Sequence, residues 1–186
     1  MLIAHLSDLH VRGEGPIALP RLVGKRATGY VNLRWRRHAS HQKWAVQALS
    51  RELRRLGVDH VAVTGDLTNL ALEDEFAAAR QLLDEDLGMP ADRVTVVPGN
   101  HDVYTRGSMH KRRFAHYLAP YLRGDVAQAS IDHAAGPFPF ARLREGVAIV
   151  GLATAVPSPP MFAYGKLGDP QLAALRRLLH NPDLRD

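Results

Sequence analysis

The stretch VVPGNHDVY, residues 96–104, places an Asn, a His and an Asp directly after a short apolar run. An apolar run bounded by Pro and Gly is typical of a buried strand that ends in a loop. Asn100, His101 and Asp102 carry side chains that bind metals or exchange protons. The stretch predicts either a structural turn or one wall of an active site, and the rest of the chain decides between them.

Two earlier apolar runs end in the same kind of polar cluster. LIAHLSD (2–8) ends in Asp8, with His10 two residues further on, and HVAVTGD (60–66) ends in Gly65 and Asp66. In an α/β fold with a parallel sheet, ligands bind at the carboxyl ends of the strands. We therefore expect these clusters and residues 100–102 to meet at one edge of a sheet.

Helical periodicity separates the apolar runs. It predicts a helix that begins at a Ser40 cap and stops at Gly57, with its apolar face at Ala45, Ala48, Leu49, Leu53 and Leu56. A second helix is expected over 73–88, with Phe76, Ala79, Leu83 and Leu87 on one face. A third is expected over 109–122, a pair of strands over 137–155, and a last helix over 169–180, with Asp169 as cap and Leu172, Leu175, Leu178 and Leu179 on one stripe. This alternation predicts an α/β fold built on a largely parallel sheet.

The composition restricts the class of protein and the chemistry. A chain of 186 residues suits one domain, which we expect to span 1–186. It has no cysteine, so metal ligands must come from His, Asp, Glu and Asn. There is no signal-peptide pattern and no apolar run near the ~20 residues of a membrane span. We expect a cytoplasmic protein, at most peripheral to a membrane.

The residue types predict a metal site. Asp8 and His10 are two apart, so in an extended chain both side chains would point to one side and grip one ion. A carboxylate such as Asp66 can bridge two ions ~3.5–4 Å apart. Asn100 offers a neutral oxygen for a second cation, and His101 would point elsewhere, toward a substrate.

Asp102 completes the catalytic hypothesis. We expect its carboxylate to hydrogen-bond the imidazole of His101 and favour the protonated ring. Each motif alone is commonly structural, because Gly-Asp after a strand is a frequent turn. Their occurrence in order, each after a successive predicted strand, favours an active site.

Three motifs carry a family resemblance. SDLH (7–10), TGDLTN (64–69) and PGNHD (98–102) resemble the first signatures of the calcineurin-like metallophosphoesterases, and 148–155 with 165–179 resemble a later strand and helix of bacterial members. The resemblance implies an αββα sandwich and two divalent ions, such as Mn, Fe or Zn. By that resemblance Asp8 and His10 bind one ion, Asp66 bridges, Asn100 binds the other, and His101 donates a proton to the leaving oxygen.

The implied activity is hydrolysis of phosphate esters, most of all phosphodiesters or pyrophosphates of nucleotide type. The alternative is a non-catalytic interaction module on a degenerate or truncated phosphoesterase fold. The chain lacks the later histidines of the family, including its Gly-His-x-His turn; His133 and His180 are the substitutes weighed, and a structural role is favoured for both. We therefore expect residues 1–186 to be the N-terminal part of a longer protein, with a sandwich incomplete at its C-terminus.

The positive charge is concentrated in one segment. The net charge is +5, yet residues 21–55 hold ten of the 24 Lys and Arg and only one acid, Glu52. Residues 11–39, rich in Gly, Pro and Arg, are expected to be a basic insertion. As a binding segment it would contact a lipid headgroup at a membrane surface or select an anionic substrate, and nucleic acid is the third choice of partner. A solvated arm without any partner is as well supported by the sequence as a binding segment.

Overall fold

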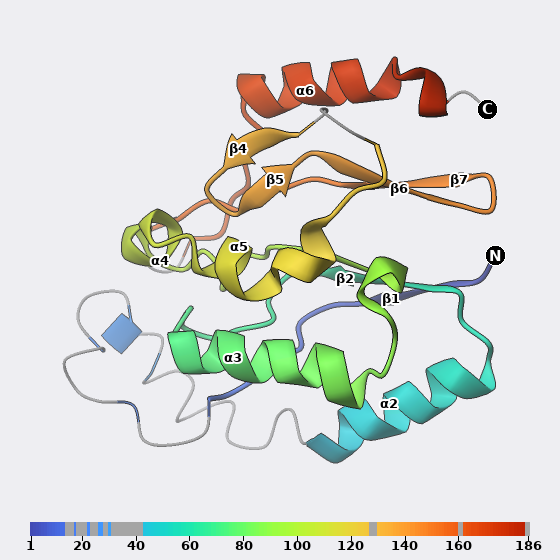
Figure 1. The fold of residues 1–186 in the computed structure, drawn as a ribbon. Helices are drawn as coiled ribbons and strands as arrows, with labels where there is room; N and C mark the ends of the chain where they lie inside the picture. Colours follow the sequence, from blue (N-terminus) through green and yellow to red (C-terminus); the bar gives the residue numbers. More distant parts are fainter. Residues whose placement is uncertain are drawn as a thin grey trace.

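The computed structural model describes residues 1–13, 17, 22, 26–27, 30, 43–126, 130–159 and 162–184. The predicted α/β fold is confirmed: a parallel sheet is flanked by helices. Figure 1 shows helix α6 on one side of the molecule, two strand hairpins beside it, then the parallel sheet, and helices α2 and α3 on the far side. This order of layers is the one expected of an αββα sandwich.

The parallel sheet has the order β1-β2-β3, with β1 at Ile3–Leu6, β2 at His60–Thr64 and β3 at Val94–Val97. Its registers pair Leu6 with Val63 and Thr64 with Val97. β-Branched residues make up all of β3 and most of β2, and both strands are buried except toward their carboxyl ends and at Ala62. All three strands therefore end at the same edge, as the sequence predicts.

Helices α2 (Lys43–Arg55) and α3 (Glu73–Gln81) confirm the first two predicted helices. The apolar face predicted for the first is right at Leu53, which is buried, and wrong at its ends, because Ala45 and Leu56 are exposed. Gly57, at φ +65°, follows α2 as the expected stop, whereas the proposed Ser40 cap lies outside the described residues. The predicted face of the second helix is fully buried, and the helix ends in the π-helical turn η2 (Leu82–Asp86). The carboxylate of Glu75 accepts the N–H groups of Leu70 and Leu72, which fixes the start of α3.

The third predicted helix is wrong in its extent. The chain forms α4 (Arg106–His110), α5 (Arg113–Leu118) and the 3-10 helix η4 (Ala119–Leu122). Arg112 separates the first two because its φ of +52° is left-handed and interrupts the helix. The start is earlier than predicted because Thr105 caps α4, accepting the N–H of Ser108 at 3.1 Å.

The second strand layer consists of two antiparallel hairpins. β6 (Phe140–Arg144) and β7 (Val147–Gly151) confirm the predicted pair, and β4 (Ile131–His133) with β5 (Gly136–Phe138) was not predicted. The 3-10 turn η3 (Ala91–Arg93) directly precedes β3.

Helix α6 (Asp169–Leu179) is present, and the 3-10 turn η5 (Pro182–Leu184) follows it, but two details differ from the prediction. Its cap position is Gly168, so Asp169 is already in the helix. Its buried face is Gln171, Ala174 and Leu178, whereas Leu179 is 55% exposed. The buried Gln171 side chain exchanges hydrogen bonds with the backbone of Ala153, which holds the helix against the segment after β7.

Most of the basic segment lies outside the described residues. Its described apolar residues, Ile17, Leu22 and Tyr30, are partly buried against the main core, and Arg26 donates to the carbonyl oxygens of Leu70 and Ala71. These residues of the segment therefore pack on the fold. In the part of the chain that the structure describes, no helix is long and apolar enough to cross a membrane.

Candidate metal centre

Three loops meet at the carboxyl edge of the parallel sheet. The loop after β1 runs beside the loop after β2, with backbone hydrogen bonds from Asp8 N to Gly65 O (3.2 Å), His10 N to Asp66 O (2.8 Å) and Val11 N to Leu67 O (2.6 Å). The loop after β3 joins them through the His101 N–H, which donates to Asp66 Oδ1 at 2.9 Å. The predicted clusters are thus brought together by main-chain contacts.

Asp8, His10 and Asp66 form a group suited to a metal ion. One ligand atom from each lies within 4.8 Å of the others. His10 Nε2 is 3.7 Å from Asp8 Oδ1. The His10 ring is buried, Asp66 is half-buried and Asp8 is 64% exposed, so the group opens to solvent on one side. A mixed set of carboxylate and imidazole ligands suits borderline divalent cations.

The backbone that presents this group is strained. Asp8, His10 and Asp66 have φ values of +57°, +44° and +53°. The prediction that Asp8 and His10 share one side of an extended chain is therefore wrong: they converge because the chain turns through left-handed conformations after Leu6. Left-handed backbone costs about 1–2 kcal/mol per non-glycine residue, and such strain collects at functional sites.

His10 is oriented by a backbone oxygen. Its Nδ1 lies 3.2 Å from the carbonyl oxygen of Thr68, an acceptor, so Nδ1 carries the proton and Nε2 keeps its lone pair. Nε2 is also the atom nearest Asp8. A histidine that ligates a metal is commonly held this way, with its other nitrogen donating to a carbonyl or carboxylate.

His101 is also oriented by a backbone carbonyl oxygen. Its Nδ1 donates to the carbonyl oxygen of Asn69 at 2.6 Å, which leaves Nε2 for other chemistry. Its ring packs edge-on against His10, with centroids 5.0 Å apart, and stacks on Tyr104 at 5.3 Å with an interplanar angle of 14°. The half-buried imidazole is therefore fixed beside the metal group.

The predicted hydrogen bond between Asp102 and His101 is wrong. The Asp102 carboxylate instead accepts the N–H groups of Gly99 (2.9 Å), Thr68 (2.9 Å) and Leu67 (3.3 Å), and lies 3.0 Å from Thr68 Oγ1. It is 1% exposed, and burial raises the pKa of its carboxyl to about 7, against the effect of these donors. Asp102 ties the loop after β2 to the loop after β3 and does not touch the imidazole.

Two glycines allow the loops to approach. A Cβ on Gly65, whose φ is +80°, would lie 2.5 Å from the Cα of Gly99. A Cβ on Gly99 would lie 2.2 Å from Asp66 Oδ1 and 2.3 Å from its backbone nitrogen. Real Cβ atoms do not approach so closely, so only glycine fits at both positions. The tight turn expected at Gly65 is present.

Asn100 lies between Gly99 and His101, the two residues that contact Asp66. It is half-buried, and its role as a ligand stays a prediction. The two substitute histidines do not join the metal group found among the described residues. His133 Nδ1 accepts the N–H of Ala135, and His180 Nδ1 contacts the carbonyl oxygen of Arg176 at the end of α6.

Sequence reasoning missed three positions that build the site. Thr68 orients His10 and contacts Asp102, and Asn69 orients His101 while its side chain donates to His10 O at 2.9 Å. Gly99 sets the distance between two loops. All three lie inside the quoted motifs TGDLTN and PGNHD, so the signal was present but their contacts depend on backbone geometry.

Comparison with protein-family models matches residues 1–165 to the calcineurin-like phosphoesterase family. The matched range contains β1, β2 and β3 and all the residues of the candidate site. It ends before α6. No curated protein matches the chain.

Proposed function

The chain belongs to the calcineurin-like phosphoesterase family, and we propose that it hydrolyses phosphate esters with divalent metal ions held at the Asp8–His10–Asp66 group. The substrates we favour are phosphodiesters or pyrophosphates of nucleotide type. The observation that carries the proposal is the convergence of these ligand atoms within 4.8 Å of one another.

The residues present fit a divalent cation. Each of the three side chains offers an atom to the same point: His10 Nε2 is left with a lone pair by the Thr68 contact, and Asp66 has a second oxygen besides the one that accepts the His101 N–H. We propose that Asp8 and His10 would hold one ion, that Asp66 would serve both that ion and a second, and that Asn100 would contribute an oxygen to the second. When bound, such ions supply positive charge for the phosphoryl oxygens and lower the pKa of water.

His101 is suited to proton transfer. Because Nδ1 donates to Asn69 O, any proton exchanged with a substrate is carried by Nε2. In the protonated ring, Nε2–H would donate to a phosphoryl or leaving-group oxygen. Stacking on Tyr104 and the edge contact with His10 keep the ring from rotating away.

The other residues of the site hold the ligands and loops in place. The backbone of His101 orients the Asp66 carboxylate, and the buried Asp102 holds the loops that carry both. We infer that Asp102 has no direct part in proton transfer, because its oxygens are occupied by backbone donors. It is a positioning residue.

The test is hydrolysis of bis(4-nitrophenyl) phosphate by the purified chain with Mn²⁺, Fe²⁺ or Zn²⁺ added in turn. We expect activity that chelator removes and that Asp66→Asn reduces at least a hundredfold, while Asp183→Asn, an exposed control, has no effect. His101→Ala should lower kcat and leave metal content unchanged. Equal rates for wild type and Asp66→Asn, or no activity with any ion, would favour the alternative of a non-catalytic module.

A further inference from the structure

A cavity lies beside the candidate metal centre. Tyr104, which stacks on His101, also lines a hollow of about 380 Å³. That volume falls within the range of small-molecule pockets, roughly 300–1,000 Å³. Tyr104 therefore connects the hollow to the imidazole that we assign to proton transfer.

The lining of the hollow suits a planar, anionic ligand. Its lining includes two aromatic residues, Tyr104 and Tyr164, together with Pro157 and Arg106. No Asp or Glu belongs to the described lining. Aromatic and guanidinium planes stack on bases, and guanidinium groups also bind phosphate.

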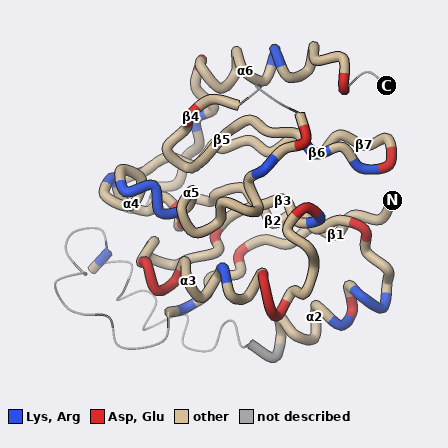
Figure 2. Tube along the Cα trace, in the orientation of Figure 1, with Lys and Arg blue, Asp and Glu red and all other residues tan. Residues whose placement is uncertain are grey.

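Arg106 is the cation available for a ligand. Figure 2 shows Lys and Arg gathered at α4 and the turn after it. Two neighbours are engaged: Arg112 pairs with Asp132, and Arg113 pairs with Glu73 at 2.8 Å. Arg106 is exposed and makes no hydrogen bond or ion pair with any residue that the structure describes. No described residue neutralises its charge.

Tyr164 presents an open aromatic surface from a loop that is closed at its base. The loop is closed by the bridge between Ala155 and Gly165 and by the hydrogen bond from Lys166 N to Thr154 O at 2.8 Å. Tyr164 is 55% exposed, although it is a large aromatic residue. A ring placed on it would gain contact area without displacing any core packing.

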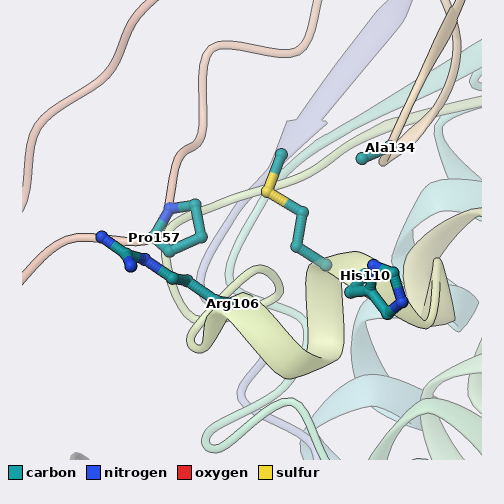
Figure 3. Close-up of a pocket in the computed structure, with 5 residues that line it drawn as sticks. Arg106, His110, Ala134 and Pro157 are labelled. Atoms are coloured by element: carbon teal, nitrogen blue, oxygen red, sulfur yellow. The ribbon is translucent and has the colours of Figure 1, made fainter.

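Arg106 also lines a second hollow. A second cavity of about 320 Å³ shares Arg106 and Pro157 with the first and is also lined by His110 and Ala134. Figure 3 shows Arg106 reaching from α4 toward Pro157, with His110 on the same helix. Arg106 and Pro157 therefore line both hollows, so one arginine is offered to a ligand in either of them.

We propose that the hollow of Tyr104, Arg106, Pro157 and Tyr164 is the specificity subsite of this enzyme and binds the base of a nucleotide. Tyr164 stacks on the base, and Arg106 binds the phosphate that links it to the rest of the substrate. The subsite rests on the proposed function for its place in catalysis, since the scissile phosphate is assigned to the metal centre. Its binding preference is independent of the metal.

The experiment measures ligand binding by isothermal titration calorimetry with the full chain kept metal-free by chelator. The ligands are AMP and ribose 5-phosphate, which share a phosphate and a ribose and differ in the base. We expect AMP to bind at least tenfold more tightly. Tyr164→Ala should bring the two affinities within about twofold, and Tyr164→Phe should keep the preference because the ring remains.

Arg106→Gln should weaken both ligands about tenfold, whereas Arg51→Gln, an exposed arginine on α2, should weaken neither. Wild-type AMP binding no tighter than that of ribose 5-phosphate, including no measurable binding of either, would overturn the subsite. So would a preference that survives Tyr164→Ala. A base preference without hydrolysis of any ester would leave the subsite standing and reject the proposed function; hydrolysis without a base preference would do the reverse.

Discussion

The backbone N–H of His101 donates a hydrogen bond to Asp66 Oδ1 at 2.9 Å. The bond joins the loop after β3 to the carboxylate that we propose as the bridge between two ions. It forms because Gly99 lets the backbone pass directly against Asp66. The position of the imidazole and the orientation of the carboxylate therefore depend on one close contact between loops.

That contact predicts the effect of Gly99→Ala. An added Cβ would lie 2.2 Å from Asp66 Oδ1, so the loops must separate. We expect metal affinity to fall at least tenfold although no ligand is altered. Calorimetric titration with Mn²⁺ measures this directly.

Gly107→Ala is the matched control. Gly107 lies in α4, and a Cβ there would meet nothing closer than 3.9 Å. Alanine is favoured over glycine in helices by up to about 1 kcal/mol, so metal affinity should not change and stability should not fall. Equal metal affinity for Gly99→Ala and wild type would show that the close approach is not needed.

Replacing Asp102 by Asn should destabilise the fold. The amide keeps the shape but offers one acceptor oxygen where the carboxylate has two, and its NH₂ would face backbone donors. Leaving buried donors unpaired costs about 1–3 kcal/mol, which urea denaturation would measure. A loss no larger than that of the exposed control Asp183→Asn would remove the structural role that we assign to Asp102.

Asp8→Gly should weaken metal binding without lowering the stability of the fold. Glycine relieves the strain of φ +57°, about 1–2 kcal/mol, and loses about 0.5–1 kcal/mol through its greater freedom in the unfolded chain. The metal-free variant should be as stable as wild type or up to about 1.5 kcal/mol more stable, yet bind metal weakly. The neighbouring Ser7→Gly should not stabilise the protein. If Asp8→Gly markedly destabilised the protein, the backbone strain that we assign to Asp8 would be contradicted.

His60 predicts how stability depends on pH. It is fully buried at the start of β2, hydrogen-bonded to Thr95 Oγ1 at 2.9 Å. Burial, with the charges of Arg142 and Arg144, lowers the pKa of His60 from 6.5 to about 4. The folded protein keeps the ring neutral while the unfolded chain takes up a proton below pH 6.5. This group's contribution to stability is therefore lost as pH falls from about 6.5 toward 4, by about 3 kcal/mol in all.

The variant His60→Gln isolates this contribution. Over the same pH range it should lose about 3 kcal/mol less unfolding free energy than wild type, measured by urea denaturation at each pH. His116→Gln, which replaces an exposed histidine packed on Tyr117, should follow the wild-type profile. Parallel profiles for wild type and His60→Gln would contradict the neutral buried ring.

The fold was predictable where local pattern and burial agree. The three parallel strands and the first two helices follow from apolar runs and helical spacing, because their side chains fill one core. The break at Arg112 was not predictable, since nothing marks a left-handed arginine in the sequence. Helix α6 was rotated in the prediction because its buried face includes Gln171, a polar residue satisfied by the backbone of Ala153.

In the candidate site, the residue types were predictable and their orientation was not. Asp8, His10 and Asp66 meet as expected, but through left-handed turns. The acceptors that orient His10 and His101 are backbone carbonyl groups of Thr68 and Asn69, which every residue possesses. Because Asp102 is next to His101 in the sequence, a hydrogen bond between them was expected. In the structure Asp102 instead joins the loop after β2 to the loop after β3.

The most direct test of the central claim is metal content per chain, measured by elemental analysis after dialysis without chelator, for wild type and Asp66→Asn. If Asp8, His10 and Asp66 hold the ion, wild type should retain at least one divalent ion per chain and the variant should lose most of it. Equal metal content in the two proteins, or none in wild type even after loading with Mn²⁺, would contradict the assignment.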